Sequence, residues 1–196
     1  MVLPLASSAR SGLVIVDMQE FFFREPERRC GLEGVIDNIN CLITHFEGQR
    51  MPIYHVVTYY QADGSDWDLK MKAAGKPGLI EGTADVRILE PVKVSSEHTI
   101  MGKTRYSAFF RTDLAEDLRL KGIRRVVVVG AYTHYCVNAT VFDAYGHDFV
   151  PCIITDAVAS HLKDEAAVIV DRMRRNGYHV CTTAEFVGGS CGQLAA

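Results

Sequence analysis

The chain has 196 residues, of which 48% are hydrophobic and 23% are charged, and its formal net charge is −3. We expect one domain over residues 1–196, with its core between about residues 12 and 187, because a chain of this size and apolar content buries one well-formed core. The small negative charge argues against nucleic acid or an anionic membrane surface as a partner, and no apolar stretch is long enough to span a bilayer.

Predicted strands and helices alternate along the first part of the chain. Residues 13–16 form a short apolar run that ends at Asp17, and residues 32–46 carry an apolar stripe at helical spacing. A second strand is predicted over residues 52–57. Residues 59–85 show little periodicity and predict a long loop, which inside a compact domain is more often a binding element or a lid than filler.

Weaker signals follow in the middle of the chain. Two brief strand-like pieces, residues 87–89 and 92–94, lie on either side of Pro91. A helix is predicted over residues 112–120. Thr112 is its expected N-cap, because a threonine hydroxyl accepts a hydrogen bond from a free backbone N–H group of the first turn.

The alternation resumes in the last third of the chain. Four consecutive valines at residues 126–129 predict a strand buried on both faces, which is typical of the middle of a parallel sheet. The remaining predicted elements are a helix over residues 137–145, a strand over residues 149–155 before Asp156, a helix over residues 162–176 before Gly177, and a strand over residues 178–181. This order predicts an α/β fold with a doubly wound parallel sheet, helices on both faces and right-handed crossovers.

The N-terminal segment and the cysteines bear on the compartment. The first ten residues lack the basic start of a signal peptide, so we expect a cytoplasmic protein. The cysteines form no C-x-x-C pair and have no regular spacing; they are Cys30, Cys41, Cys136, Cys152, Cys181 and Cys191. We expect reduced thiols instead of a disulfide framework, and no zinc site, because cysteine and histidine never cluster at ligand spacing.

Cys136 occupies the most informative position in the sequence. It follows the four-valine strand and Gly130, at the point where a helix is predicted to begin. Open α/β folds bind their ligands at the carboxyl ends of the strands, and the dipole of a helix N-terminus stabilises a thiolate. The ordinary alternative is a small buried hydrophobic residue, since free cysteine is among the most buried residue types.

Asp17 and Lys103 give this cysteine a chemical context. Asp17 ends the first predicted strand, and a parallel sheet would bring it, Lys103 and Cys136 to one edge. A thiol needs a base that accepts its proton and a cation that stabilises the thiolate, and these two side chains supply both. Taken singly, Asp17 could cap a helix and Lys103 could lie on the surface, and spacing alone does not show that the three residues meet.

Four segments carry a resemblance to a known family. They are Val16-Asp17-Met18-Gln19 with Phe22, then Lys103 to Phe109, then Gly130 to Val137 with Thr140, Asp143 and Ala144, and finally Thr155-Asp156-Ala157. On these segments, which occur in family order, the chain resembles the isochorismatase-like cysteine hydrolase superfamily. That superfamily includes nicotinamidases, N-carbamoylsarcosine amidase, biuret and ureidoacrylate amidohydrolases, and the isochorismatases.

The resemblance implies a doubly wound α/β fold and a site. The catalytic triad would be Asp17, Lys103 and Cys136, with no cofactor. A cis peptide bond would join Ala131 and Tyr132, and the backbone N–H groups of Tyr132 and Cys136 would form an oxyanion hole. The residues expected to line the substrate pocket are Phe22, Thr58, Tyr106 and Tyr132. Similar proteins are often dimers or tetramers, so we expect a homo-oligomer with a small-molecule substrate.

Two departures from the family narrow the prediction. Nicotinamidases bind a metal through an Asp-x-His pair after the second strand; this chain lacks the pair, and His55 is interpreted as a structural histidine, so we expect no catalytic metal. Isochorismatases have glycine where this chain has Cys136, because protonation of a vinyl ether needs an acid and no thiol. His161, Arg105 and Arg111 are candidates to bind a substrate carboxylate.

The sequence therefore predicts a cysteine-dependent hydrolase that cleaves a C–N bond of a small amide, ureido or carbamoyl substrate through a thioester. The first alternative is a vinyl ether hydrolase of the isochorismatase type. The second is a non-catalytic protein that uses Cys136 to sense peroxide or to bind a ligand.

Overall fold

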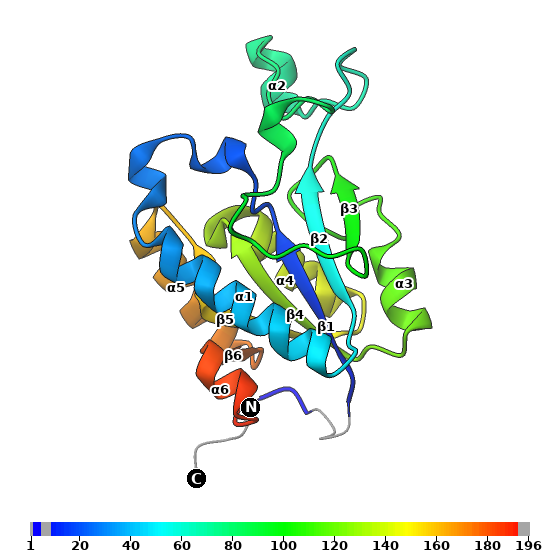
Figure 1. The fold of residues 1–196 in the computed structure, drawn as a ribbon, viewed down its shortest axis with the longest axis vertical. Coiled ribbons are helices and arrows are strands. Elements are labelled where there is room, and N and C mark those ends of the chain that lie inside the picture. The colour runs from blue at the N-terminus through cyan, green and yellow to red at the C-terminus, as the bar shows by residue number, and fades with distance from the viewer. Residues whose placement is uncertain (1, 5–8, 192–196) are drawn as a thin grey trace.

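The protein is built on a six-stranded sheet in which every pair of neighbouring strands is parallel. The computed structural model describes residues 2–4 and 9–191. The strands are β1 (Ser11–Val16), β2 (Ile53–Thr58), β3 (Thr99–Lys103), β4 (Arg125–Ala131), β5 (Val150–Ala159) and β6 (His179–Cys181). Their order across the sheet is β3-β2-β1-β4-β5-β6 (Figure 1), which confirms the predicted doubly wound fold class.

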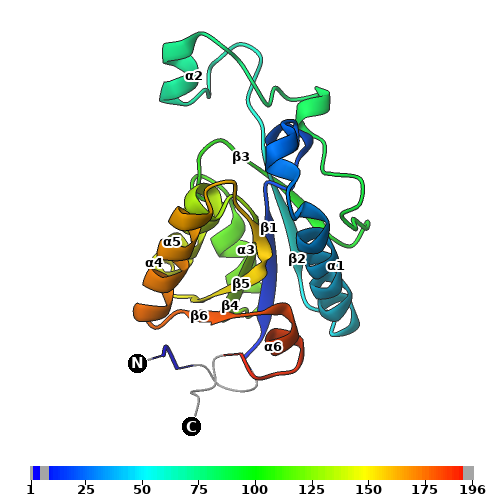
Figure 2. The ribbon, with the colours of Figure 1, turned by 90° about the vertical axis from the view of Figure 1, so that its left-hand side faces the viewer.

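Helices cover both faces of this sheet. They are α1 (Leu32–Gly48), α2 (Leu69–Ala74), α3 (Leu114–Leu120), α4 (Asn138–Gly146), α5 (Lys163–Arg175) and α6 (Thr183–Val187). Figure 2 shows α1 on one side of the sheet and α4 and α5 on the other. The α1 stripe, which includes Ile39, Leu42 and Phe46, packs against one face together with Phe186 of α6. Because strands between two helical layers have no solvent side, all four valines of β4 are buried.

The strand order reverses between β1 and β4, and this position places the site. The chain first moves outward from β1 through β2 to β3 and then returns to β4 on the other side of β1. Ligands of such sheets bind beyond the carboxyl ends of the strands at this reversal. Gly130 lies there, with a φ of +108°, and a Cβ at this residue would collide with the backbone of Val16. A glycine is therefore required for β4 to pass β1.

The predicted strands at residues 87–89 and 92–94 are wrong. Leu89 and Val92 are buried, but they pack against the core from a loop. The strand of this region is β3, which pairs with β2 at the edge of the sheet. Because β3 has one strand neighbour and leaves Ile100 58% exposed, it lacks the continuous apolar run by which the central strands are recognised.

Several element boundaries also differ from the predictions. The loop at residues 59–85 contains α2, whose N-cap Asp68 accepts a hydrogen bond from the Met71 backbone. Helix α3 begins at Leu114, so Thr112 is not its N-cap; Asp113 occupies that position. Strand β5 continues through Asp156 to Ala159. Helix α6 follows β6 through a capping box and was not predicted.

The expectation that all six cysteines are reduced is wrong, because Cys181 and Cys191 form a disulfide. These two residues are ten positions apart, and α6 lies between them, so the fold and not the spacing brings their sulfur atoms together.

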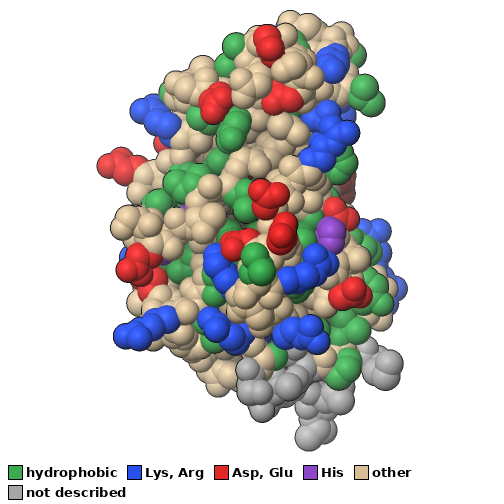
Figure 3. All heavy atoms as spheres, turned by 90° about the vertical axis from the view of Figure 1, so that its right-hand side faces the viewer, with side chains coloured by type: hydrophobic (Ala, Val, Ile, Leu, Met, Phe, Trp, Pro, Cys, Tyr) green, Lys and Arg blue, Asp and Glu red, His purple; other side chains and the backbone are tan. Residues whose placement is uncertain are grey.

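Within the described residues, no helix combines the length and the hydropathy that a membrane span needs. Figure 3 shows acidic and basic side chains interspersed on the face that it displays. This mixture agrees with the small net charge of −3.

Candidate functional site

Asp17, Lys103 and Cys136 meet at the carboxyl edge of the sheet, as the sequence predicts. Asp17 follows β1, Lys103 ends β3 and Cys136 follows β4. The Lys103 ammonium lies 2.8 Å from the Asp17 carboxylate and donates a hydrogen bond of 3.4 Å to the Cys136 sulfur. All three are buried, with exposures of 0%, 3% and 7%. A carboxylate, a cation and a thiol thus form one contiguous cluster.

Thr58 is the fourth member of this cluster. Its hydroxyl donates to Asp17 Oδ1 at 2.8 Å and accepts a hydrogen bond of 2.6 Å from Lys103 Nζ. Both of its hydrogen bonds therefore connect it to charged side chains. Although Thr58 also lines the cavity described below, its hydroxyl is committed to orienting Asp17 and Lys103.

A buried glutamine holds Thr58 in place. Gln19 Nε2 donates to the Thr58 carbonyl at 2.9 Å, and the Thr58 N–H donates to Gln19 Oε1 at 2.8 Å. The same Nε2 donates to the Val86 carbonyl at 3.0 Å, which connects the end of the long loop to the site. The sequence shows Gln19 two residues after Asp17 but gives no indication of this role, because spacing does not reveal where an amide points.

The charges of the cluster depend on each other. Burial disfavours the ammonium of Lys103, but the negative charges of Asp17 and Cys136 outweigh burial, so the pKa of Lys103 is raised. Burial, with a further contribution from Asp17, raises the pKa of the Cys136 thiol, and Lys103 opposes this shift only in part. The raised pKa favours the protonated thiol, so a base is needed to form the thiolate, which is the role that the sequence predicts for Asp17.

The backbone around Cys136 forms a distinctive turn. A five-residue π-helical turn, Thr133–Val137, separates β4 from α4 and contains the cysteine. The peptide bond between Ala131 and Tyr132 is cis, at the position where the resemblance places it. Cys136 thus lies two residues before the start of α4, and its sulfur accepts a hydrogen bond from Lys103.

A cavity of about 360 Å³ opens onto this cluster and is large enough for a small-molecule ligand. Its lining includes Lys103, Cys136 and three of the predicted pocket residues, Phe22, Thr58 and Tyr106. Several other members of the lining could not be predicted from the sequence. These are Phe21, Asp68, Met71, Lys76, Pro77, Gly78 and Leu79. Many of them belong to the long loop and α2, where absent periodicity gave no indication of which side chains point inward.

The predicted pocket residue Tyr132 is not part of the lining of this cavity. Its hydroxyl donates a hydrogen bond to the Phe22 carbonyl, and its ring packs edge-on against Phe22 and Phe23. His161 lies beside Tyr132 and His134, with ring centroids 4.8 Å from each, and does not line the cavity. Of the cationic candidates, Arg105 lines the cavity and Arg111 does not.

His55 is a buried structural histidine, as predicted. It is 1% exposed within β2, and its Nε2 lies 3.0 Å from Nδ1 of His98. Burial lowers the pKa of His55 to about 4, with a further contribution from His98. The neutral ring is therefore the form that this position holds.

Comparison with known proteins identifies the family of the chain. The family model of the isochorismatase domain matches residues 11–185. "Enterobactin synthase component B" of Escherichia coli K12 is 27% identical over 179 residues, which cover 91% of this chain but only 62% of that protein. The chain therefore spans less than two thirds of the length of this relative.

Two solved structures show the same architecture. An isochorismatase family protein from Desulfovibrio vulgaris is 27% identical, with a TM-score of 0.84 and coverage of 91% of this chain and 97% of that one. Nicotinamidase/pyrazinamidase PncA from Bacillus subtilis is 26% identical, with a TM-score of 0.78 and coverage of 88% and 99%. Since the family model covers most of the chain, the protein belongs to the isochorismatase domain family.

Proposed function

We propose that this protein is a hydrolase that cleaves the C–N bond of a small amide, ureido or carbamoyl substrate through a thioester on Cys136. The observation that carries the proposal is the contact of one Lys103 ammonium with both the Asp17 carboxylate and the Cys136 sulfur, at the wall of a cavity. A base, a cation and a nucleophile in contact are the parts that covalent acyl transfer needs. The similarity to a nicotinamidase/pyrazinamidase supports amide chemistry.

The mechanism follows from the protonation states of the cluster. Because burial raises the pKa of Cys136, the thiol transfers its proton to Asp17 as its sulfur attacks the carbonyl carbon. Lys103 stays charged and stabilises the thiolate as it forms. Asp17 then delivers the proton to the departing nitrogen. In the second half, Asp17 takes a proton from water, the hydroxide attacks the thioester, and the proton returns to the Cys136 sulfur.

The oxyanion of the tetrahedral intermediate requires its own donors. By the resemblance, we assign this role to the backbone N–H groups of Tyr132, which precedes the turn, and of Cys136, which lies within it. A donor of this kind contributes about 3 kcal/mol to the transition state. Backbone donors suit a substrate whose carbonyl oxygen gains charge during the reaction.

The vinyl ether alternative makes a different demand on the same residues. It needs an acid, which Asp17 supplies, and it makes no use of a thiol. The close contact between Cys136 and Lys103 favours C–N cleavage, because a hydrolysis without a nucleophile would leave this contact unused. The requirement for the Cys136 thiol therefore distinguishes the two reactions.

The deciding experiment compares the wild type with Cys136→Gly on two sets of substrates. One set contains small amides, ureides and carbamoyl compounds and is followed by release of ammonia; the other is isochorismate. We expect the wild type to hydrolyse a member of the first set and to form an acyl adduct on Cys136 that mass spectrometry detects. Loss of the nucleophile lowers turnover by at least about 1,000-fold.

The matched control is Cys41→Gly, which removes an exposed cysteine of α1 that is not part of the cluster, and we expect it to leave turnover unchanged. Amide hydrolysis by Cys136→Gly at the wild-type rate would overturn the covalent mechanism. Consumption of isochorismate by both the wild type and Cys136→Gly, with every C–N substrate untouched, would establish the vinyl ether reaction instead.

A further inference from the structure

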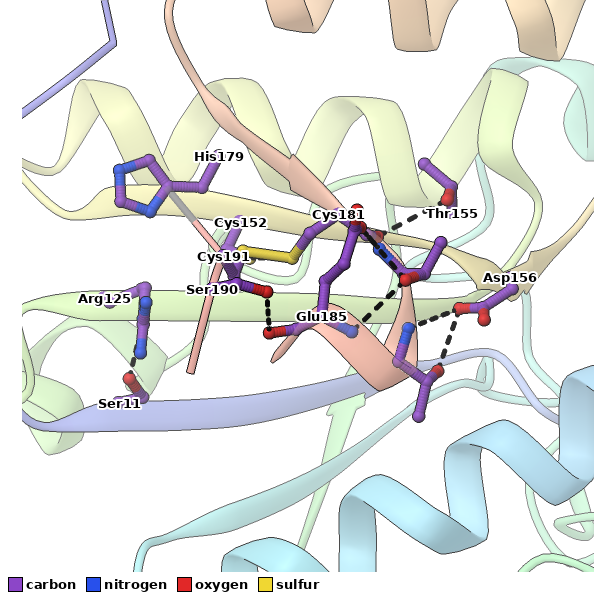
Figure 4. Close-up of a disulfide and its surroundings, with 12 residues drawn as sticks. Ser11, Arg125, Cys152, Thr155, Asp156, His179, Cys181, Glu185, Ser190 and Cys191 are labelled. Atoms are coloured by element: carbon purple, nitrogen blue, oxygen red, sulfur yellow. Dashed lines mark hydrogen bonds between the residues drawn. A yellow bond between two sulfur atoms is a disulfide. The ribbon is translucent and has the colours of Figure 1, made fainter. Parts of the chain in front are cut away.

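Three cysteine sulfurs converge away from the catalytic cluster, in a place that the proposed mechanism does not use. Cys152 lies near the start of β5, Cys181 ends β6, and Cys191 follows α6. Cys181 and Cys191 form the disulfide, and the Cys152 thiol lies beside it (Figure 4). The Cys152 sulfur is 3.9 Å from that of Cys181 and 3.6 Å from that of Cys191.

These distances match the spacing of ligands around a metal ion. Zinc binds thiolates at about 2.3 Å in a tetrahedron, whose corners then lie about 3.8 Å apart. The two distances from Cys152 fall on either side of this value. Only the Cys181–Cys191 pair is closer, and reduction of its covalent bond frees these sulfurs to separate to the same spacing.

A cation lies beside the three sulfurs. Burial raises the pKa of the Cys152 thiol and so disfavours its thiolate, and the positive charge of Arg125 offsets part of this effect. Arg125 donates to the Ser11 hydroxyl at 2.9 Å and, within the described residues, forms no ion pair with a carboxylate. Three thiolates around one zinc ion carry one net negative charge, which this cation balances. Cys191 is partly exposed, so an ion can enter, and water can supply the fourth ligand.

We propose that Cys152, Cys181 and Cys191, in their reduced form, bind one zinc ion, and that the Cys181–Cys191 disulfide excludes it. A dithiol reductant opens the disulfide by supplying two electrons and two protons, and it leaves as its own disulfide. Zinc then displaces the three thiol protons and bonds to the three sulfurs. Both forms connect Cys191, which follows α6, to the sheet. The oxidised form does so through the covalent bond to Cys181 of β6, and the zinc-bound form through the metal, which also binds Cys152 of β5.

The test is a zinc titration of the full chain, reduced with a phosphine and desalted without oxygen. Competition with a chromophoric chelator measures the affinity, and native mass spectrometry counts the ions. We expect one zinc ion per reduced chain and none on the oxidised chain. Cys152→Ser removes one ligand and lowers the affinity by at least about 100-fold. Cys41→Ser, an exposed cysteine of α1, and Cys136→Ala keep the wild-type affinity.

A second measurement needs no variant at the site. Zinc should slow the alkylation of Cys181 and Cys191 by N-ethylmaleimide in the reduced wild type, and peptide mass mapping measures the rate at each cysteine. The rates at the exposed Cys30 and Cys41 should be unchanged. Reduced wild type that takes up no zinc, equal zinc affinity of Cys152→Ser and the wild type, or alkylation at Cys181 and Cys191 that ignores zinc would each overturn the proposal. None of these outcomes depends on the hydrolytic activity.

Discussion

The hydroxyl of Thr58 provides a test of how the catalytic cluster is organised. Thr58→Val replaces the hydroxyl with a methyl group of similar size and removes the hydrogen bonds to Asp17 and Lys103 at 2.8 and 2.6 Å. A hydrogen bond to a charged group contributes about 1.5–3 kcal/mol. The ion pair between Asp17 and Lys103 survives the substitution and retains part of this energy. We therefore expect the free energy of unfolding to fall by about 3 kcal/mol.

The effect on catalysis distinguishes positioning from substrate binding. If Thr58 orients Asp17 and Lys103, then Thr58→Val lowers kcat by about 10- to 100-fold and leaves KM nearly unchanged. The reason is that the misaligned carboxylate and ammonium act in the chemical step and not in substrate binding. If Thr58 binds the substrate directly, KM rises and kcat is preserved.

The assay measures kcat and KM on whichever substrate the ammonia-release panel identifies, with urea denaturation in parallel. Thr58→Ser keeps the hydroxyl and serves as the matched control, which should retain most of kcat. Wild-type kcat in Thr58→Val, or a loss that Thr58→Ser shares in full, would refute the argument that these two hydrogen bonds align the site.

Three further predictions concern stability. Gly130→Ala should destabilise the protein by more than about 3 kcal/mol in urea denaturation, because its φ of +108° and the Val16 backbone both exclude a Cβ; an effect below 1 kcal/mol would contradict this. The pKa of His55 falls to about 4 when the protein folds, so the unfolded chain binds the proton first as the pH decreases. We expect this histidine to lower the free energy of unfolding by about 3 kcal/mol between pH 6.5 and 4. His55→Gln should lose this pH dependence, and an unchanged dependence in the variant would contradict the prediction. Without reductant or zinc, Cys191→Ser should lower the free energy of unfolding by about 2–3 kcal/mol, because it removes the disulfide to Cys181. An unchanged free energy of unfolding would mean that the disulfide is absent in solution.

Local chemistry made the central part of the fold predictable. The valines of β4 form a continuous apolar run because the strand is buried on both faces. The apolar residues of α1 recur at helical spacing because one face of the helix is buried. Both patterns can be recognised in the sequence. The edge strand β3 left no such record, since Ile100 faces solvent and Lys103 is the only fully buried residue of the strand. Position in the sheet, which local periodicity does not encode, decided which strands could be predicted.

The candidate site likewise contains residues that could be predicted from the sequence and residues that could not. Asp17 and Cys136 could be predicted because each follows a strand that the sequence shows. The role of Thr58 could not, because its hydrogen bonds depend on where a hydroxyl points across 41 and 45 residues of chain. The raised pKa of Cys136 could not be predicted, since the sequence does not show how completely the fold buries the thiol.

The edge position of β3 has a consequence for how the protein loses activity. Lys103 is held by a single ladder, to β2, whereas Asp17 and Cys136 follow strands that are paired on both sides. Local openings of native proteins favour segments with few buried contacts, and an edge ladder opens at a lower free energy than a central one. The cation of the cluster is thus attached to an edge strand, whereas its two partners follow central strands. We therefore expect mild denaturant to abolish turnover by detaching β3 while the central strands are still paired.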